Sequence, residues 1–445
     1  MNYEMQDSLQ FDIKELSLFV KGKKIDIRNM YEEINLFDSI FSPCMSGSIL
    51  MRDAVGLTDT FLFDGTELLK IQISKNSDFL QIEKTFRIYK QTNRKPNNQN
   101  SESYILHFVS EEMFISLQRK VSQLFESTYA EAAVQILQDY LNVPTEKMYG
   151  VFDNSLGVKK IVIPNLNPIL ALSWLAQRAI DENLFPGFLF YENINGYNFV
   201  SLSTLLKQQH IAKVNFDPKN IGTLSSQSGT NEFLGARYFE VIQQYDVLKN
   251  VVEGVYAGTF VGFDPVTKTI VKKPVSFLDN YNKIDRTNSS PNVGAIKSSI
   301  GYNMDQYDSK VVFHPFSYFQ RDSNYVKEND PESINLNLDT ENYVLQRKSI
   351  FTNLTNQRVK IVVPGNLGFS AGHNLFLKTP KYGIKDESSN NLDKSTYGNY
   401  LIAASRHIIR YSTHETILEL VTDSSNRSDD GKIYSSTQEQ MVDYT

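Results

Sequence analysis

Short stretches in which apolar and polar residues alternate are the feature that most restricts how this chain can fold. Ile13–Val20 and Leu68–Ile73 are clear examples. A period of two places successive side chains on opposite faces of a β-strand, whereas a helical face repeats every 3.6 residues or so. The pattern therefore predicts an antiparallel β domain from Phe11 to Val109. The polar run Thr92–Asn100, which interrupts it, is expected to be a solvated hairpin loop.

The middle of the chain changes to helical signals. Thr128 and Glu131 form a capping box, in which a hydroxyl and a carboxylate satisfy the free amides of a first helical turn. Asn167-Pro168 opens a second helix, with the asparagine as cap and proline at the first helical position. Asn195-Gly196, between two apolar stretches, is the strongest hairpin signal in the chain. We therefore expect a mixed helix and hairpin domain over residues 111–215.

Beyond residue 215, ordered and irregular segments alternate. A Ser/Gly/Thr linker spans Thr223–Thr230, and Phe233–Val252 is expected to be a helix passing into a strand. A hairpin is predicted over Tyr256–Phe277, and Asn280–Asp339, rich in Asn, Ser and Asp, is predicted to be an irregular excursion. A helix, four strands and a flexible polar tail are then predicted in turn at Asn342–Leu354, Arg358–Val363, Asn374–Lys378, Tyr400–Tyr411, Thr416–Thr422 and Asn426–Thr445.

Two glycines indicate that the outer β regions are related. Gly65 precedes the strand predicted at Leu68–Ile73, and Gly372 precedes the one at Asn374–Lys378. We interpret this correspondence as a distant duplication, which would build two similar barrels within one subunit.

Charge and cysteine content exclude several classes of protein. The 445 residues allow two to four domains of ordinary size. A formal net charge of −6 argues against a dedicated nucleic-acid-binding protein, because such proteins rely on attraction to phosphates. Cys44 is the single cysteine, which excludes an internal disulfide and fits a reducing cytoplasm. The sequence shows neither a signal peptide nor an apolar stretch long enough to span a membrane.

The residues that usually perform catalysis or bind metals form no recognisable motif. The closest histidine pair, His407 and His414, is interpreted as two sheet-surface histidines on either side of a turn. Cys44 is expected to pack at the start of a strand rather than act as a nucleophile. Phe86–Lys90 alternates aromatic and basic residues, as a base-stacking platform does, but a half-buried strand needs the same alternation. The histidines are His107, His210, His314, His373, His407 and His414.

We therefore predict no catalytic, cofactor-binding or metal-binding residue, no cofactor and no enzyme activity. Aspartates and glutamates are abundant, but an acid and base pair needs a set separation across a sugar, which sequence spacing does not reveal.

Along nearly its whole length the sequence resembles the baseplate central hub proteins of contractile-tailed, T-even-like bacteriophages, a tail-tube-related family also found in contractile injection systems. The order is an acidic and hydrophobic strand, a short apolar connection, a strand ending in Asp, and a glycine ahead of the next strand. The segments that carry the resemblance are Ile25–Ile34, Phe37–Phe41, Gly47–Asp53, Gly65–Glu67, Tyr245–Asn250, Gly254–Ala257, Tyr400–Ala403, His407 and His414–Thr416.

The resemblance implies an α+β, β-rich subunit with two tube-type antiparallel β-barrel domains, a mixed α/β domain and an irregular insertion between them. The implied domains are a first barrel, the mixed domain, a second barrel in two parts, an inserted excursion and a flexible tail, at residues 1–110, 111–215, 216–258 with 342–425, 259–341 and 426–445.

The resemblance also implies a homotrimer that forms a pseudo-sixfold ring between a trimeric central spike and a hexameric tail tube. Its partners would be itself, the tube protein, the spike protein and other baseplate proteins such as wedge and tape measure proteins. Genomic DNA would pass through the channel without specific binding, which the acidic balance of the chain favours. The implied location is the tail baseplate of the virion, after assembly in the host cytoplasm. No lysozyme or spike β-helix is appended, so those parts are expected to be separate proteins.

Two other functions stay open at this point. The chain could be the hub of a bacterial contractile injection system, which gene neighbourhood would distinguish from a phage. It could instead be a carbohydrate-binding or carbohydrate-cleaving tail protein, which a glycan cleavage screen with Asp and Glu substitutions would reveal.

Overall fold

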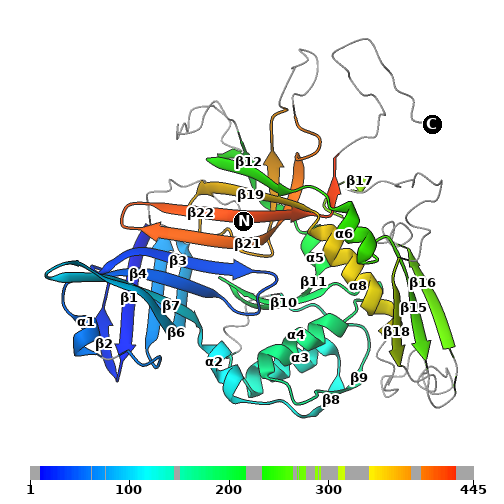
Figure 1. The fold of residues 1–445 in the computed structure, drawn as a ribbon, viewed down its shortest axis with the longest axis horizontal. Helices are drawn as coiled ribbons and strands as arrows, with labels where there is room; N and C mark the ends of the chain where they lie inside the picture. The colour runs from blue at the N-terminus through cyan, green and yellow to red at the C-terminus, as the bar shows by residue number, and fades with distance from the viewer. Residues whose placement is uncertain are drawn as a thin grey trace, which may run out of the picture.

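The protein, described here from a computed structural model, is a β-rich α+β chain in which two antiparallel β regions are joined edge to edge (Figure 1). The β-rich fold expected from the alternation of residues is thus confirmed. The structure describes residues 11–61, 63–75, 77–144, 151–216, 233–263, 268, 270–276, 286–288, 290–291, 309–315, 340–381 and 392–426. Three predicted segments lie wholly or mostly outside these residues. They are the linker Thr223–Thr230, the tail Asn426–Thr445 except for Asn426 itself, and most of Asn280–Asp339.

The N-terminal β region, here called the N-terminal unit, has the antiparallel strand order β3-β4-β7-β6-β5-β1-β2. Alternate residues point into its core, for example Tyr104, Leu106 and Phe108, which are fully buried. The antiparallel β region predicted from Phe11 to Val109 is confirmed. Its elements are β1 Phe11–Val20, β2 Lys23–Asp26, β3 Tyr31–Ser39, β4 Ser46–Asp53, α1 Leu57–Thr60, β5 Leu68–Lys75, β6 Ser77–Asn98 and β7 Ser101–Ser110.

The polar run predicted to be a loop is mostly strand. β6 continues to Asn98, and only two residues separate it from β7. Pairing with β7 supplies the backbone hydrogen bonds, and Arg94 bridges to Glu102 across the ladder at 2.7 Å. The loop prediction was wrong because a two-sided polar strand has no alternation in its sequence.

The middle of the chain forms helices and hairpins around a separate apolar core. Thr128 and Glu131 form the predicted capping box, with each side chain bonded to the other residue's backbone amide. The second helix begins at Pro168 as predicted. The predicted hairpin also forms, but its two turn residues are Ile194 and Asn195, because Gly196 already pairs with Asn193. The elements are α2 Glu111–Gln118, β8 Leu124–Ser127, α3 Tyr129–Asp139, β9 Lys159–Val162, α4 Pro168–Arg178, β10 Phe188–Asn193, β11 Gly196–Ser201 and α5 Leu202–Lys207.

The second β region, here called the C-terminal unit, is built around the antiparallel order β14-β19-β22-β21-β20, with β12 parallel to β20 and β13 parallel to β12. The strands predicted from residue 358 onward are all present. The elements are β12 His210–Asn215, β13 Phe233–Gly235, β14 Tyr238–Gln243, β19 Gln357–Pro364, β20 Asn374–Lys378, β21 Gly398–Arg410 and β22 His414–Thr422.

One prediction about this part of the chain needs correction. Phe233–Val252 runs from strands to a helix, not from a helix to a strand, because α6 (Val247–Val252) follows β13 and β14. β12, at the end of the predicted mixed domain, pairs with β20 of the C-terminal unit. The predicted domain boundaries stay predictions.

The inserted region is not wholly irregular. β15 (Ala257–Phe263) pairs with β16 (Ile270–Ser276) as the predicted hairpin and with β18 (Val311–Pro315) in parallel. The hairpin's turn, Asp264–Thr267, lies outside the described residues. β17 (Ser290–Pro291) pairs with β23 (Ser424–Ser425). The predicted helix is present as α8, Thr340–Leu354.

The two units repeat one five-strand pattern. In chain order, β3, β4, β5, β6 and β7 form the antiparallel order β3-β4-β7-β6-β5, and β14, β19, β20, β21 and β22 form the order β14-β19-β22-β21-β20. Gly65 and Gly372, the glycines that suggested a duplication, precede equivalent strands and have φ of +87° and +92°. We call this pattern the five-strand repeat.

Candidate functional site: the seam between the two units

The two units join through β3 and β21, whose antiparallel pairing runs from Ser39 opposite Ala404 to Glu33 opposite Arg410. We call this pairing the seam. β21 is long enough to serve both units, because its first residues pair with β20 and its later residues pair with β3. The seam makes one continuous antiparallel layer with the order β14-β19-β22-β21-β3-β4-β7-β6.

One face of the seam carries charges paired across strands. Glu33 accepts a hydrogen bond from Arg410 at 2.8 Å and lies 3.9 Å from Arg406. Burial alone would raise the pKa of Glu33, but hydrogen bonds from Asn35 and Arg410 hold the pKa below its usual value. Opposite charges on neighbouring strands stabilise the register in which they face each other.

The other face of the seam is buried and holds a carboxylate. Asp38, 3% exposed, accepts hydrogen bonds from the hydroxyls of Ser370 and Ser405, and the amide of Ala371 lies 3.4 Å from both of its oxygens. A buried carboxylate is tolerated when donors satisfy its oxygens. Asp38 therefore ties the loop ahead of β20 to the strand that joins the two units.

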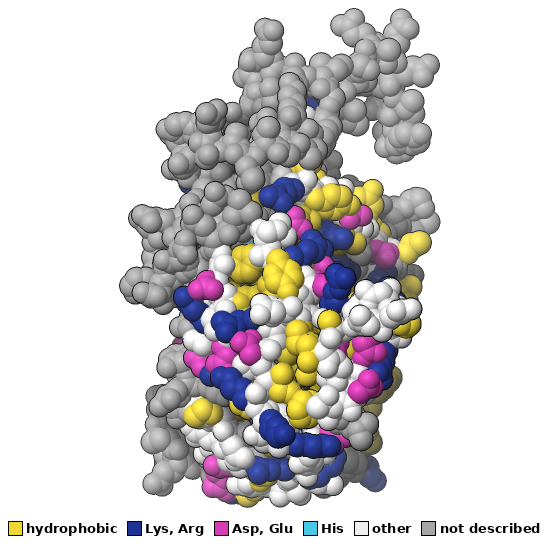
Figure 2. All heavy atoms as spheres, turned by 90° about the vertical axis from the view of Figure 1, so that its left-hand side faces the viewer, with side chains coloured by type: hydrophobic (Ala, Val, Ile, Leu, Met, Phe, Trp, Pro, Cys, Tyr) yellow, Lys and Arg dark blue, Asp and Glu magenta, His cyan; other side chains and the backbone are white. Residues whose placement is uncertain are grey.

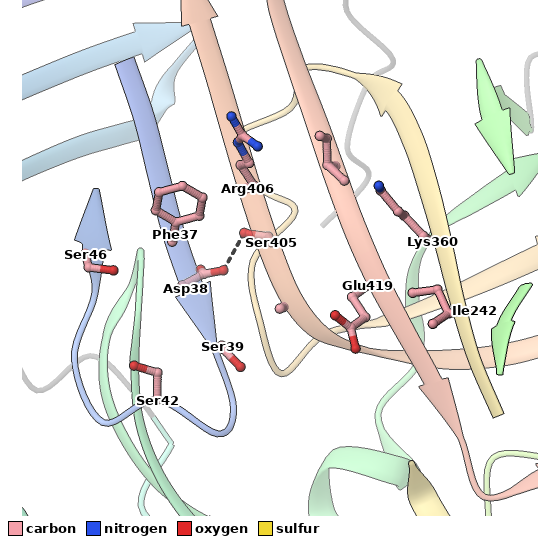
Figure 3. A pocket seen from close by; sticks show the side chains of 12 residues that line it. Phe37, Asp38, Ser39, Ser42, Ser46, Ile242, Lys360, Ser405, Arg406 and Glu419 are labelled. Atoms are coloured by element: carbon pink, nitrogen blue, oxygen red, sulfur yellow. Dashed lines mark hydrogen bonds between the residues drawn. The ribbon is translucent and has the colours of Figure 1, made fainter. Parts of the chain in front are cut away.

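A hollow of about 450 Å³ lies beside the seam (Figure 3). Phe37 of β3 and Arg406 of β21 line one part of it, and Lys360 of β19 and Glu419 of β22 line another. Ile242 of β14 also contributes to the wall. The volume is within the range of small-molecule pockets, but the charged side chains are spread along the open face of a sheet rather than converging on one point.

Ser405, His407 and Asp38 are adjacent but are not arranged for nucleophilic catalysis. The Ser405 hydroxyl lies 3.4 Å from Nε2 of His407, a long separation for proton transfer. The Ser405 hydroxyl donates to Asp38, whereas in a triad the serine hydroxyl bonds the histidine and the carboxylate orients the imidazole. All three residues are at most 3% exposed.

The prediction for His407 and His414 was partly wrong. They are neighbours across the β21–β22 hairpin, with Nδ1 of His407 3.2 Å from Nε2 of His414, but each is only 1% exposed. They are buried because the face of the hairpin that carries them packs inward, which local sequence does not reveal. Thr416 is a further neighbour, with its hydroxyl 3.2 Å from Nδ1 of His407.

The other histidines make separate contacts. His107 lies 2.9 Å from the hydroxyl of Thr92, His210 packs against Phe376, and Nδ1 of His314 lies 2.7 Å from the carbonyl oxygen of Pro315. Burial lowers the pKa of His373, whose Nδ1 lies 3.1 Å from the carbonyl oxygen of Ser370.

Cys44 and the aromatic-basic strand lie as expected. Cys44 is 5% exposed just ahead of β4, and burial raises the pKa of its thiol well above the usual value, which disfavours the reactive thiolate. Phe86 and Ile88 point into the core from β6, so the half-buried strand interpretation is confirmed.

Among the described residues, no group of three or more His, Cys, Asp or Glu side chains is arranged to bind a metal ion. None of the helices in the described part of the chain is long and apolar enough to cross a membrane.

The seam residues Asp38, Ser405 and Glu33 were not singled out from sequence. The only available signal was that Asp38 and Ser405 occupy inward positions of apolar strands, where a polar residue needs a partner. The partners lie more than 300 positions away along the chain.

The fold places the chain in a structural class that solved phage tail proteins share. The tail protein from Neisseria meningitidis MC58 superimposes with a TM-score of 0.51 at 12% identity, over 93% of this chain and 97% of that one. The 43 kDa tail protein of prophage MuSo2 from Shewanella oneidensis gives a TM-score of 0.50 at 9% identity, over 92% and 98%. No protein-family model and no curated protein matches the sequence. At these identities the likeness shows a common fold.

Proposed function

We propose that the protein is a structural hub of a contractile tail, whose three copies form a pseudo-sixfold ring between a threefold spike and a sixfold tube. The observation that carries the proposal is the five-strand repeat. A subunit with two equivalent units lets a threefold assembly present six similar elements on one side while its remaining parts keep threefold symmetry on the other. The fold shared with phage tail proteins over almost the full length supports this role.

The repeat extends to a local irregularity. In the N-terminal unit the pairing with β7 skips Tyr89, between Ile88 and Lys90. In the C-terminal unit the pairing with β22 skips Ala403, between Ile402 and Ala404. β-bulges re-aim a strand at a defined point, so the same bulge at equivalent positions supports two units of one design.

In this role the protein is not a catalyst. Its partners are further copies of itself, the tube protein, the spike protein and neighbouring baseplate proteins, and DNA passes through the ring without sequence-specific contact. Several charges on the strands beside the seam are paired, for example Arg358 of β19 with Glu419 of β22 at 2.6 Å and Arg237, just ahead of β14, with Glu415 of β22 at 2.7 Å. Paired charges offer few free cations to phosphates, which favours passage over binding.

The proposal is tested by purifying the full chain and measuring its mass by light scattering, alone and with the tube and spike proteins encoded beside it. We expect three copies in the particle and capture of both partners. A monomer that joins neither protein would refute the proposal. Neighbouring capsid and terminase genes would identify a phage, and their absence beside sheath and tube genes would favour an injection system.

A further inference from the structure

The continuous layer through the seam has two unpaired edges. In the part of the chain that the structure describes, β14 pairs with β19 alone, and β6 beyond Arg87 pairs with β7 alone. An unpaired strand presents a row of amide and carbonyl groups that favour pairing with another strand. The two edges lie at opposite ends of the same antiparallel order.

The five-strand repeat makes these edges equivalent to the two strands of the seam. β14 occupies the position of β3, and β6 occupies the position of β21. Equivalent backbone bonds support the match, because Ile88 donates to the carbonyl of Glu67 at 3.0 Å and Ile402 donates to that of His373 at 2.8 Å. Inside one chain, therefore, a β3-type edge already pairs with the second half of a β21-type strand.

Burial shows what the missing partner changes. Leu36 of β3 is fully buried at the seam, whereas Val241, its equivalent in β14, is 37% exposed. Ile242 is 43% exposed and Tyr238 is 45% exposed on the same strand. β14 thus has the composition of a paired strand and the exposure of an unpaired one.

The repeat also gives the register. Phe37 faces Arg406 at the seam. Ile34 and Phe239 face the equivalent residues Ile49 and Ile361. Three residues before these, Phe37 faces Ser46 and Gln243 faces Arg358, because the β14–β19 pairing skips Ile242. Gln243 therefore corresponds to Phe37.

On the other strand, Ile402 and Ile88 are equivalent. Arg406 lies four residues after Ile402 and faces Ile417, and Thr92 lies four residues after Ile88 and faces Ile105. Thr92 therefore corresponds to Arg406, so Gln243 is placed opposite Thr92.

We propose that β14 of one copy adds as an antiparallel strand to residues 90–98 of β6 in a second copy, with Gln243 opposite Thr92. This inference rests on the proposed ring and names the strands that close it. The register is committed over Lys90–Thr92, opposite Tyr245–Gln243, because β6 has a further irregularity beyond Thr92, where Asn93 has φ of +55°.

Charge and apolar surface favour this pairing over β14 with β14 or β6 with β6. β14 carries Glu240, and the free part of β6 carries Lys90 and Lys95, so unlike edges attract and like edges repel. The face of the molecule on which the N-terminal unit lies shows an apolar band flanked by charged side chains of both signs (Figure 2). A contact between unlike edges is head-to-tail, and such contacts generate rings when the rotation closes.

The residues that follow β14 in the chain add exposed apolar surface beside this edge. Tyr245 is 67% exposed and Leu248 of α6 is 82% exposed. Large apolar side chains clustered beside an open strand edge are typical of a protein interface.

The test is disulfide formation between copies in a Cys44→Ala background. Copies with Gln243→Cys are mixed with copies with Thr92→Cys and oxidised mildly. Directly opposed residues have the Cα separation that a disulfide needs, roughly 4.4–6.8 Å. We expect a covalent dimer in the mixture at least tenfold above either variant alone. The matched control replaces Thr92→Cys with Asn98→Cys, six residues along the same edge, and we expect no product.

Equal products with both partners, or a dimer from Gln243→Cys alone, would overturn the pairing. A trimeric mass with no product at Thr92 would overturn the pairing and leave the proposed ring standing. A monomeric mass would overturn both.

A second variant separates interface loss from misfolding. Ile242→Lys places a charge on the exposed edge, so we expect the particle mass to fall to one chain while the melting temperature of the single chain stays unchanged. Val55→Lys is the control, because Val55 is 74% exposed and belongs to neither β14 nor β6. A full-size particle with Ile242→Lys would contradict the proposed pairing.

Discussion

The Ser405 hydroxyl of β21 donates a hydrogen bond to the Asp38 carboxylate of β3, and this buried contact joins the two β units from within. The residues are 367 positions apart in the sequence. Because Ser370 donates to the other carboxylate oxygen, Asp38 holds both the seam strand and the loop that leads into β20.

Removal of this carboxylate is expected to destabilise the whole chain. Asp38→Ala leaves two buried hydroxyls without an acceptor, which costs about 1–3 kcal/mol for each unsatisfied group. Urea unfolding measures the loss. Asp59→Ala is the control, since its side chain is 84% exposed, and it should change stability by less than about 0.5 kcal/mol. Equal effects of the two substitutions would contradict the role of Asp38.

The glycines that precede β5 and β20 provide a matched pair. Both have positive φ, but a Cβ at Gly372 would lie 2.0 Å from the Tyr191 hydroxyl, whereas a Cβ at Gly65 meets nothing within 4 Å. Gly65→Ala should therefore cost only the conformational strain, about 1–2 kcal/mol, and Gly372→Ala clearly more. Thermal unfolding compares them. A larger loss of stability for Gly65→Ala than for Gly372→Ala would contradict the role assigned to the close approach of Tyr191.

Lys84 and Glu192 form an ion pair at 2.7 Å that connects β6 of the N-terminal unit to the β10–β11 hairpin. Glu192 is 4% exposed and also accepts from the amide of Met45 at 2.8 Å. Lys84→Met leaves a buried carboxylate without its cation, and the expected loss is about 3–5 kcal/mol by urea unfolding.

Lys24 offers a control for that substitution because it pairs with Glu15 at an exposed site. Lys24→Met should cost less than about 1 kcal/mol. Addition of Glu192→Gln to Lys84→Met should recover part of the lost stability. A further loss of stability instead would indicate that the carboxylate of Glu192 contributes more to stability than its ion pair with Lys84.

His373 makes stability depend on pH. Burial lowers the pKa of the folded imidazole below the ordinary value of 6.5, so below that pH the unfolded chain binds more protons. The free energy of unfolding should therefore fall as the pH drops through 6.5. His373→Gln should reduce this dependence, as measured by urea unfolding at pH 7.5 and pH 5.5. An unchanged pH dependence would contradict the assignment to His373.

Local signals in the sequence predicted local structure well. The capping box of Thr128 and Glu131 and the hairpin signalled by Asn195-Gly196 depend on neighbours within a few residues, and both form, the turn one residue earlier than predicted. The alternation in β7 likewise gives its buried face directly, since one side of the strand meets the core.

Features decided by distant partners were missed. The polar part of β6 is a strand because β7 pairs with it. In the same way, β14 is a strand because β19 pairs with it. His414 is buried because the turn that includes Gly365 passes against its ring, at a distance that leaves no room for a side chain at Gly365. The candidate interface was invisible for the same reason: only the paired registers show that β14 and β6 repeat β3 and β21.

The most direct test of the account is an electron cryomicroscopy map of the assembled particle formed by the full chain. The account predicts three chains in one ring, six five-strand repeats at near-equal angles, and β14 of each chain beside β6 of the next. A ring with another number of chains, or with the two repeats of one chain at unrelated radii, would contradict it.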